Sequence, residues 1–397
     1  MKKHSSKKKA LLIALAVIVV LILGAVGAVY GVTHGFYRSS NYTSDEDAMK
    51  DFTNVGEDTT AEDEVNPEDA TGEVLSDEEQ QELDAKLAEF ADSEPVTNDG
   101  NVYNVLLVGV DRRDKSWAGN SDSMILMSLN YEKKQISMIS LMRDTYVNIP
   151  GIGMRKLNAA HANGAGPLLL ETVTQNYKVQ VDRYVSVDFN SMIDIIDKLG
   201  GVELTLSDDE VRVANNYITE MCNLRKLDPN SYYFIKGGTK TCSGIQAVAY
   251  ARIRYVGNAD YQRTERQRTV LTKMMEKIKD MSLPELYSFA EDVLPLVTHN
   301  IPEDEMWSLL AKSPSLLQYK LVKDRIPYDN MYKVIYVKKQ DMLVPDWEQT
   351  IAKLKETLYE RLKSGGIRIR KDSGTAFLRC ITSKFVRHSF SRCVAYQ

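Results

Sequence analysis

Residues 10–32 form a run of 23 residues without a charged side chain, and this run restricts the chain's architecture most strongly. As a helix it would span about 34 Å, which is enough for the hydrocarbon core of a bilayer. Five lysines stand in the preceding residues 1–9, and Arg38 is the first Lys, Arg, Asp or Glu after the run. The positive-inside rule therefore predicts a single-pass cell-membrane protein with a cytoplasmic basic tail at 1–9 and an extracytoplasmic remainder. A cleaved signal peptide, cut near 25–28, is the alternative, but its apolar region is usually shorter.

The net charge of −5 averages over segments of very different composition. Residues 33–99 are poor in apolar side chains, and 41–99 carry 21 acidic residues against two lysines, so they are predicted to be an acidic, solvated linker. Within it, Ser76 and Glu79 form a capping box that favours a short helix at 76–90. Residues 366–397 hold seven basic residues and one acidic residue without clear periodicity, which predicts a disordered or non-native tail.

Strands and helices alternate over residues 100–365, which predicts an α/β domain with a mixed central β-sheet flanked by helices. Apolar segments bounded by turn residues predict strands at 101–110, 123–130, 135–141, 184–187 and 202–206. Helical periodicity and capping residues predict helices at 167–177, 188–199, 262–281, 284–297, 303–312 and 345–363.

The four cysteines are too few for a disulfide framework. Cys222 and Cys242 enclose a 19-residue stretch, and in an extracytoplasmic domain a disulfide there is one expectation. The alternative is two unpaired thiols.

Acidic and basic residues gather where the predicted apolar elements end. Guanidinium groups bind phosphate oxygens in a bidentate manner, and carboxylates are ligands for Mg²⁺. Arginines converging beside two aspartates would suit a metal-bridged pyrophosphate. The candidate residues are Asp111, Arg113, Asp122, Arg143, Asp144, Lys156, Arg252, Arg254, Asp260, Arg263 and Gln267.

Plainer interpretations exist for several of these residues. Asp111 is also a typical turn residue after a strand, and Arg263, Arg266 and Arg268 would suit an ordinary solvated helix face. His161 is expected to be structural rather than a catalytic base. The predicted extracytoplasmic location argues against a nucleic-acid partner for the basic segments.

Several ordered segments resemble the LytR–CpsA–Psr family of cell-envelope phosphotransferases over about residues 101–280. They include NVLLVGVDRR, NSDSMILMSL, ISMISLMRDTYVNIP, RKLNAAHANGAGPLLLETV, DRYVSVDFNSMIDIIDKLGGVEL and AVAYARIRYVGNADYQRTERQRTVL. The resemblance implies transfer of a teichoic acid-like or capsule-like glycopolymer from a polyprenyl-pyrophosphate carrier to peptidoglycan N-acetylmuramic acid in a Gram-positive-type envelope.

By motif, the resemblance implies that Asp111 and Asp122 bind Mg²⁺, with Mn²⁺ as a substitute. It implies that Arg143, Arg252, Arg254, Arg263 and Gln267 bind the pyrophosphate, with less defined binding roles for Arg113 and Lys156. Either Asp144 or Asp260 would orient an arginine or accept the hydroxyl proton. The helices at 167–177 and 188–199 are expected to wall the polyprenyl pocket, although plain core packing explains the same residues.

The chain departs from the family pattern at Asn120 and Met142, where the family often has Arg and Pro. The Asn120 difference puts one phosphate contact in doubt but leaves the metal site intact. Two other functions stay open at this point: a polyprenyl-pyrophosphate hydrolase, and a non-catalytic module that binds polyprenyl phosphate or wall polymer.

Overall fold

The computed structural model describes residues 34–360, apart from 36, 51, 53–63, 67, 94, 113–115, 255, 258 and 317. The membrane helix predicted at 10–32 and the basic tail predicted at 366–397 lie outside the described residues. Within the described ranges, no helix is both long and apolar enough to cross a bilayer.

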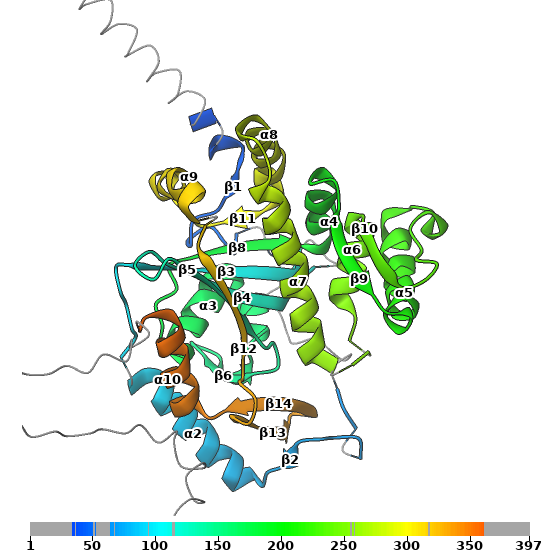
Figure 1. The fold of residues 1–397 in the computed structure, drawn as a ribbon. Helices are drawn as coiled ribbons and strands as arrows, with labels where there is room; N and C mark the ends of the chain where they lie inside the picture. The colour runs from blue at the N-terminus through cyan, green and yellow to red at the C-terminus, as the bar shows by residue number, and fades with distance from the viewer. Residues whose placement is uncertain are drawn as a thin grey trace, which may run out of the picture. The chain divides into compact units, whose positions relative to one another are not determined.

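A seven-stranded mixed sheet lies at the centre of the domain (Figure 1). Its order is β1 (Asn41–Tyr42), β11 (Thr298–His299), β8 (Arg183–Asp188), β3 (Val102–Asp111), β4 (Asn120–Asn130), β5 (Gln135–Leu141) and β12 (Lys320–Ile326). The pairs β3–β4, β4–β5 and β11–β8 are antiparallel, whereas β3–β8, β5–β12 and β1–β11 are parallel. The predicted mixed α/β architecture is confirmed.

Helices pack on both faces of this sheet. One face lies against a core that includes α2 (Asp77–Ser93), α3 (Ala159–Tyr177) and α10 (Trp347–Leu358). A second core joins the helices associated with the other face: α4 (Phe189–Lys198), α5 (Asp208–Arg225), α6 (Gly244–Arg252), α7 (Ala259–Lys279) and α8 (Leu283–Val293). In Figure 1, α7 crosses in front of the sheet beside the group formed by α4, α5 and α6.

Short sheets and further helices surround the central sheet. The small sheets pair β9 (Val202–Leu206) with β10 (Gly238–Cys242), β6 (Tyr146–Ile149) with β7 (Gly153–Lys156), and β13 (Tyr332–Val337) with both β2 (Glu73–Val74) and β14 (Gln340–Pro345). A further α-helix is α9 (Glu303–Leu316), and two 3₁₀-helices cover Pro229–Ser231 and Leu294–Leu296.

Local sequence signals set several boundaries near the site. Asp188 ends β8 and caps α4, because its side chain accepts a hydrogen bond from the backbone N–H of Ser191 at 2.8 Å. Capping boxes begin α5 at Ser207 and α6 at Ser243. The helix predicted at 188–199 therefore appears as α4, because its start is specified locally.

Two stretches of the predicted acidic linker differ from the solvated spacer that we expected. Residues 41–42 pair with β11 as β1, and residues 73–74 pair with β13 as β2. The helix predicted at 76–90 appears as α2, and it packs Leu83, Leu87 and Phe90 against the main core. The prediction of a solvated spacer used the low average hydrophobicity of the segment. An average does not show this packing, because a few apolar residues on one face are enough to dock a segment.

The structure contains no disulfide between Cys222 and Cys242, and both are buried free thiols. The expected bond is therefore a wrong prediction. Cys222 lies in α5 and Cys242 ends β10, and both belong to the second hydrophobic core. Sequence separation alone could not show which apolar neighbours surround each thiol.

Candidate functional site

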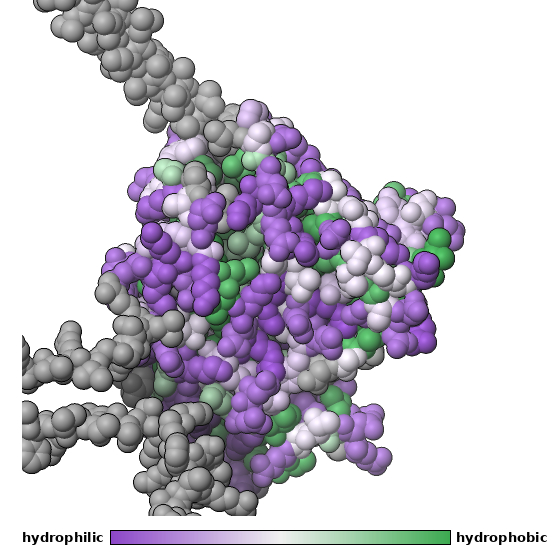
Figure 2. All heavy atoms as spheres, viewed as in Figure 1, coloured by the Kyte–Doolittle hydropathy of each residue, from purple (hydrophilic) through white to green (hydrophobic). Residues whose placement is uncertain are grey.

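A cavity of about 870 Å³ lies between the central sheet and helices α4 to α8. On β3, Leu107, Gly109 and Asp111 line it, whereas Leu106 and Val110 belong to the core on the opposite face. This division follows from the alternation of side chains along a strand. The surface in Figure 2 is mostly hydrophilic, with hydrophobic residues showing in patches between hydrophilic ones.

Most of the cavity wall is apolar. The helices contribute Phe189, Met192, Ile195, Val248, Val270, Leu271, Met274, Ile278, Phe289 and Val293. Of the two helices expected to wall a polyprenyl pocket, α4 lines this cavity. Among the described lining residues none comes from α3, whose buried residues belong to the main core, so the core interpretation holds for 167–177. Such a wall suits a long hydrocarbon chain.

Polar residues from distant parts of the sequence line the same cavity. Seven of the predicted site residues are among them: Asp111, Asp122, Arg143, Arg252, Arg254, Arg263 and Gln267. Arg263 and Gln267 lie four residues apart on α7 and face the cavity together, because residues at this spacing share one face of a helix. Arg252 is the last residue of α6, and Arg254 follows the C-cap residue Ile253.

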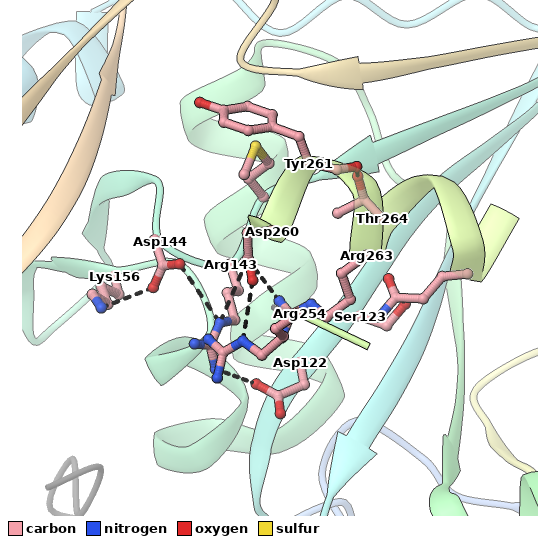
Figure 3. Close-up of polar contacts among 12 residues, drawn as sticks. Asp122, Ser123, Arg143, Asp144, Lys156, Arg254, Asp260, Tyr261, Arg263 and Thr264 are labelled. Carbon is pink, nitrogen blue, oxygen red and sulfur yellow. Dashed lines mark hydrogen bonds and ion pairs between the residues drawn. The ribbon is translucent and has the colours of Figure 1, made fainter. Parts of the chain in front are cut away.

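Ion pairs connect the polar residues into a continuous network (Figure 3). Arg143, which is only 5% exposed, donates from Nη1 to Asp122 Oδ1 at 2.8 Å. Its Nε lies 3.6 Å from Asp144 Oδ2 and 3.8 Å from Asp260 Oδ2. Asp260 also accepts from Arg263 Nη2 at 2.8 Å and from Arg254 Nε at 3.2 Å.

Lys156 lies behind this network rather than in the cavity wall. Its Nζ is 2.8 Å from Asp144 Oδ1, and its side chain is 5% exposed. Lys156 and Asp144 therefore support Arg143 from the side away from the cavity. Arg113 lies outside the described residues.

The environment shifts the pKa values of the buried aspartates in different directions. Burial acts to raise the pKa of Asp122, but nearby Arg143 and Arg263 outweigh it and hold this pKa below its usual range. The same balance, with Arg143 and Lys156 as the main cations, lowers the pKa of Asp144. Burial prevails at Asp260, where Arg263 opposes it and the Asp144 carboxylate adds to it, so this pKa is raised.

Arg252 has its own contacts in the cavity wall. Its guanidinium lies 4.9 Å from the Phe189 ring and 4.8 Å from the Tyr217 ring, and Nη2 donates to Glu220 Oε1 at 3.2 Å. These aromatic contacts hold a planar cation at the cavity wall, a geometry that Lys would not reproduce.

Arg266 has a structural role in the site that the sequence analysis did not predict. Arg263, Arg266 and Arg268 are 4%, 2% and 9% exposed, so the solvated helix face is a wrong interpretation. Arg266 donates from Nε to Glu210 Oε1 at 2.8 Å, and from Nη1 and Nη2 to the backbone carbonyls of Ile253 and Val256, each at 3.1 Å. It thereby fixes the backbone on both sides of Arg254.

His161 has the structural role that we expected. It is buried, and its Nδ1 is 2.8 Å from the backbone carbonyl oxygen of Gly119. Burial lowers the pKa of His161 to about 4, so the ring is neutral at physiological pH. Asn120, the neighbour of Gly119, lines the cavity at the position where the family often has Arg.

Comparisons with known proteins agree with this arrangement. The chain is 32% identical over 195 residues to biofilm regulatory protein A of Streptococcus mutans, which covers 46% of each protein. It is 30% identical over 238 residues to the polyisoprenyl-teichoic acid–peptidoglycan teichoic acid transferase TagU of Enterococcus faecalis, covering 59% of this chain and 71% of that protein. The chain thus spans about half the length of the first relative and more of the second.

Similarity in three dimensions extends over a larger share of the chain. The solved structure of TagT bound to LIIa-WTA has a TM-score of 0.52 and 25% sequence identity, and the match covers 68% of this chain and 93% of that one. The LytR_cpsA_psr family model matches residues 67–356, which include every described residue of the polar network. This protein therefore belongs to the LytR_cpsA_psr family.

Proposed function

We propose that this protein is an extracytoplasmic, Mg²⁺-dependent transferase. In this proposal it moves a teichoic acid-like or capsule-like glycopolymer from a polyprenyl-pyrophosphate carrier to N-acetylmuramic acid of peptidoglycan. The observation that carries the proposal is one cavity with a long apolar wall and a cluster of arginines. The names of related TagU and the ligand of related TagT support it.

Each part of the cavity has a role in substrate binding. The apolar residues of α4, α7 and α8 would take the polyprenyl chain out of water, which favours binding roughly in proportion to the area buried. Arg252, Arg254 and Arg263 would bind the pyrophosphate oxygens, and Gln267 would add a neutral donor. Gln267 is already oriented, because its Oε1 accepts a hydrogen bond from Ser123 Oγ at 3.0 Å.

Asp111 and Asp122 fit a magnesium site in their chemistry. The low pKa of Asp122 keeps this carboxylate ionised, and Asp111 lines the same cavity. Among the described residues no group of three or more His, Cys, Asp or Glu side chains could hold a metal, so phosphate oxygens and water would complete the coordination. When bound, Mg²⁺ or Mn²⁺ would neutralise charge that develops on the pyrophosphate.

Asp260 is better suited than Asp144 to accept the proton of the attacking sugar hydroxyl. Asp144 pairs with Arg143 and Lys156, which lower its pKa, whereas Asp260 contacts the cavity residues Arg254 and Arg263 and its pKa is raised, as a general base requires. The 6-hydroxyl oxygen of N-acetylmuramic acid would form a bond to the glycan-linked phosphorus. The bond from that phosphorus to the bridging oxygen would break, polyprenyl phosphate would leave, and the hydroxyl proton would pass to Asp260.

The location of the reaction rests on residues 10–32. Anchored as a membrane helix with a cytoplasmic N-terminus, this run would place the domain on the side where peptidoglycan is assembled. The carrier lipid would then approach from the same bilayer. Accessibility of an engineered tag after residue 360 to a membrane-impermeant reagent in intact cells tests this orientation.

The activity test uses the full-length protein in detergent with a polyprenyl-pyrophosphate glycan, peptidoglycan oligomers and Mg²⁺. We expect labelled glycan on the oligomer, and we expect Asp122→Asn to reduce the rate about 100-fold or more. Asp209→Asn is the matched control, because Asp209 is 70% exposed and pairs with Arg212 in the same helix.

Three outcomes would contradict the proposal. Free polyprenyl phosphate without labelled oligomer would indicate a hydrolase. Lipid binding without turnover would indicate a non-catalytic module. Full activity of Asp122→Asn would remove the metal assignment.

A further inference from the structure

The described residues 34–35, 37–50 and 52, called the strap here, run from α9 to the connection between β3 and β4. At its start, His34 Nδ1 lies 3.0 Å from Glu303 Oε1, and Tyr37 Oη donates to the Ile301 carbonyl at 3.1 Å. β1 then pairs in parallel with β11, and Asn300 Nδ2 donates to Asp45 Oδ1 at 3.0 Å. Figure 1 shows β1 beside β11 and near α9.

The other end of the strap contacts residues next to the proposed metal ligands. Ala48 is 7% exposed and belongs to a small apolar cluster with Ala118 and Ala165, against which Met49 and Phe52 pack. The Arg112 guanidinium lies 5.7 Å from the centroid of the Phe52 ring. The strap therefore contacts both ends of the β3–β4 connection.

Those two ends set the positions of the site carboxylates. Arg112 directly follows Asp111, and Ala118 lies four residues before Asp122. The intervening Gly119 has a φ of +84°, and a Cβ there would lie 2.6 Å from the Asp111 carbonyl oxygen. The backbone is thus closely packed at this point, and a shift at Arg112 or Ala118 would be transmitted to Asp111 and Asp122.

We propose that the strap is a positioning element of the active site, which holds the β3–β4 connection so that Asp111 and Asp122 face the cavity together. The strap itself touches no substrate in this proposal. Its effect on the metal site depends on the proposed function, but its hold on the connection does not. Because the strap follows residues 10–32, the segment nearest the predicted anchor also supports the site.

The test compares two strap variants with a matched control in the full-length protein. Phe52→Ala removes the ring under Arg112, and Ala48→Asp places a carboxylate in the apolar cluster. Glu46→Ala is the control, because Glu46 lies in the same segment and is exposed. Trypsin cleavage after Arg112 measures release of the connection, and the melting temperature measures global folding.

We expect Phe52→Ala to be cleaved after Arg112 about tenfold faster than the parent protein, which corresponds to about 1.4 kcal/mol of local opening free energy. Glu46→Ala should match the parent, and the melting temperature of Phe52→Ala should stay within about 2 °C of the parent, because the change is local. Ala48→Asp should be cleaved at least as fast as Phe52→Ala, which provides a second test of the contact between the strap and the connection.

Binding of Mn²⁺ alone, followed by electron paramagnetic resonance, separates positioning from a merely structural role. We expect about tenfold weaker Mn²⁺ binding in Phe52→Ala and no change in Glu46→Ala. Unchanged cleavage in both strap variants would overturn the proposal, and so would faster cleavage with unchanged Mn²⁺ binding. If the parent protein binds no Mn²⁺ and transfers no glycan, the proposed function fails, and the cleavage rates alone decide whether the strap holds the connection.

Discussion

Replacing Arg266 with methionine should destabilise the domain more than replacing an exposed arginine on a helix would. The guanidinium is 2% exposed and makes one hydrogen bond to Glu210 and two to backbone carbonyls. Methionine fills much of the volume but leaves Glu210, which is 13% exposed, without this cation. Breaking a buried pair from one side costs about 3–5 kcal/mol of unfolding free energy. At about 2 °C per kcal/mol for a large domain, the melting temperature should fall by about 6–10 °C.

Urea unfolding followed by tryptophan fluorescence measures this loss. Arg212→Met is the matched control, because Arg212 is 75% exposed and pairs with Asp209, and we expect a change below about 0.5 kcal/mol. Arg266→Lys should recover only part of the stability, because one ammonium group cannot reproduce the planar fork that reaches three acceptors. A double-mutant cycle with Glu210→Gln isolates the pairwise contribution.

Arg266→Met should also weaken binding of a polyprenyl-pyrophosphate, because the carbonyls of Ile253 and Val256 lie on both sides of Arg254. A loss below about 1 kcal/mol in unfolding free energy would refute the reasoning. It would mean that the guanidinium contributes no more than an exposed ion pair.

Three further predictions follow from burial. The pKa of Asp122 is lowered in the folded state, so its carboxylate stabilises the domain fully above the unfolded pKa of about 3.9. This contribution to the unfolding free energy is lost as the pH falls through the folded pKa. Below about pH 4 the unfolding free energy should therefore fall more steeply in the parent than in Asp122→Asn. Met274→Asp puts a charge on the apolar wall and should raise the KM for a polyprenyl substrate more than it lowers kcat, whereas a short-chain analogue should be affected less. Peptide-mapped thiol labelling should leave Cys222 and Cys242 unmodified until urea unfolds the domain, because burial raises both thiol pKa values, and rapid labelling in buffer would contradict the buried-thiol assignment.

Much of the secondary structure was predictable because its signals are local. The apolar strands at 101–110 and 135–141 appear as β3 and β5, and the capped helix at 188–199 appears as α4. Seven predicted polar residues share one cavity because the strands, helices and loops that carry them meet around the same face of the sheet. The prediction of a solvated linker depended on average composition. Composition cannot show that β1 pairs with β11, which lies more than 250 residues away in the sequence.

The sequence by itself determined the residue types available for the chemistry and the local elements that carry them. Spacing along α7 was enough to place Arg263 and Gln267 on one face, because helical geometry is set within a few residues. Only the tertiary structure decided that Arg266 is buried under the Arg254 backbone, that α4 rather than α3 lines the cavity, and that the strap touches the β3–β4 connection. Each of these depends on contacts between distant segments, whose burial and charge environment exist only once the chain has packed.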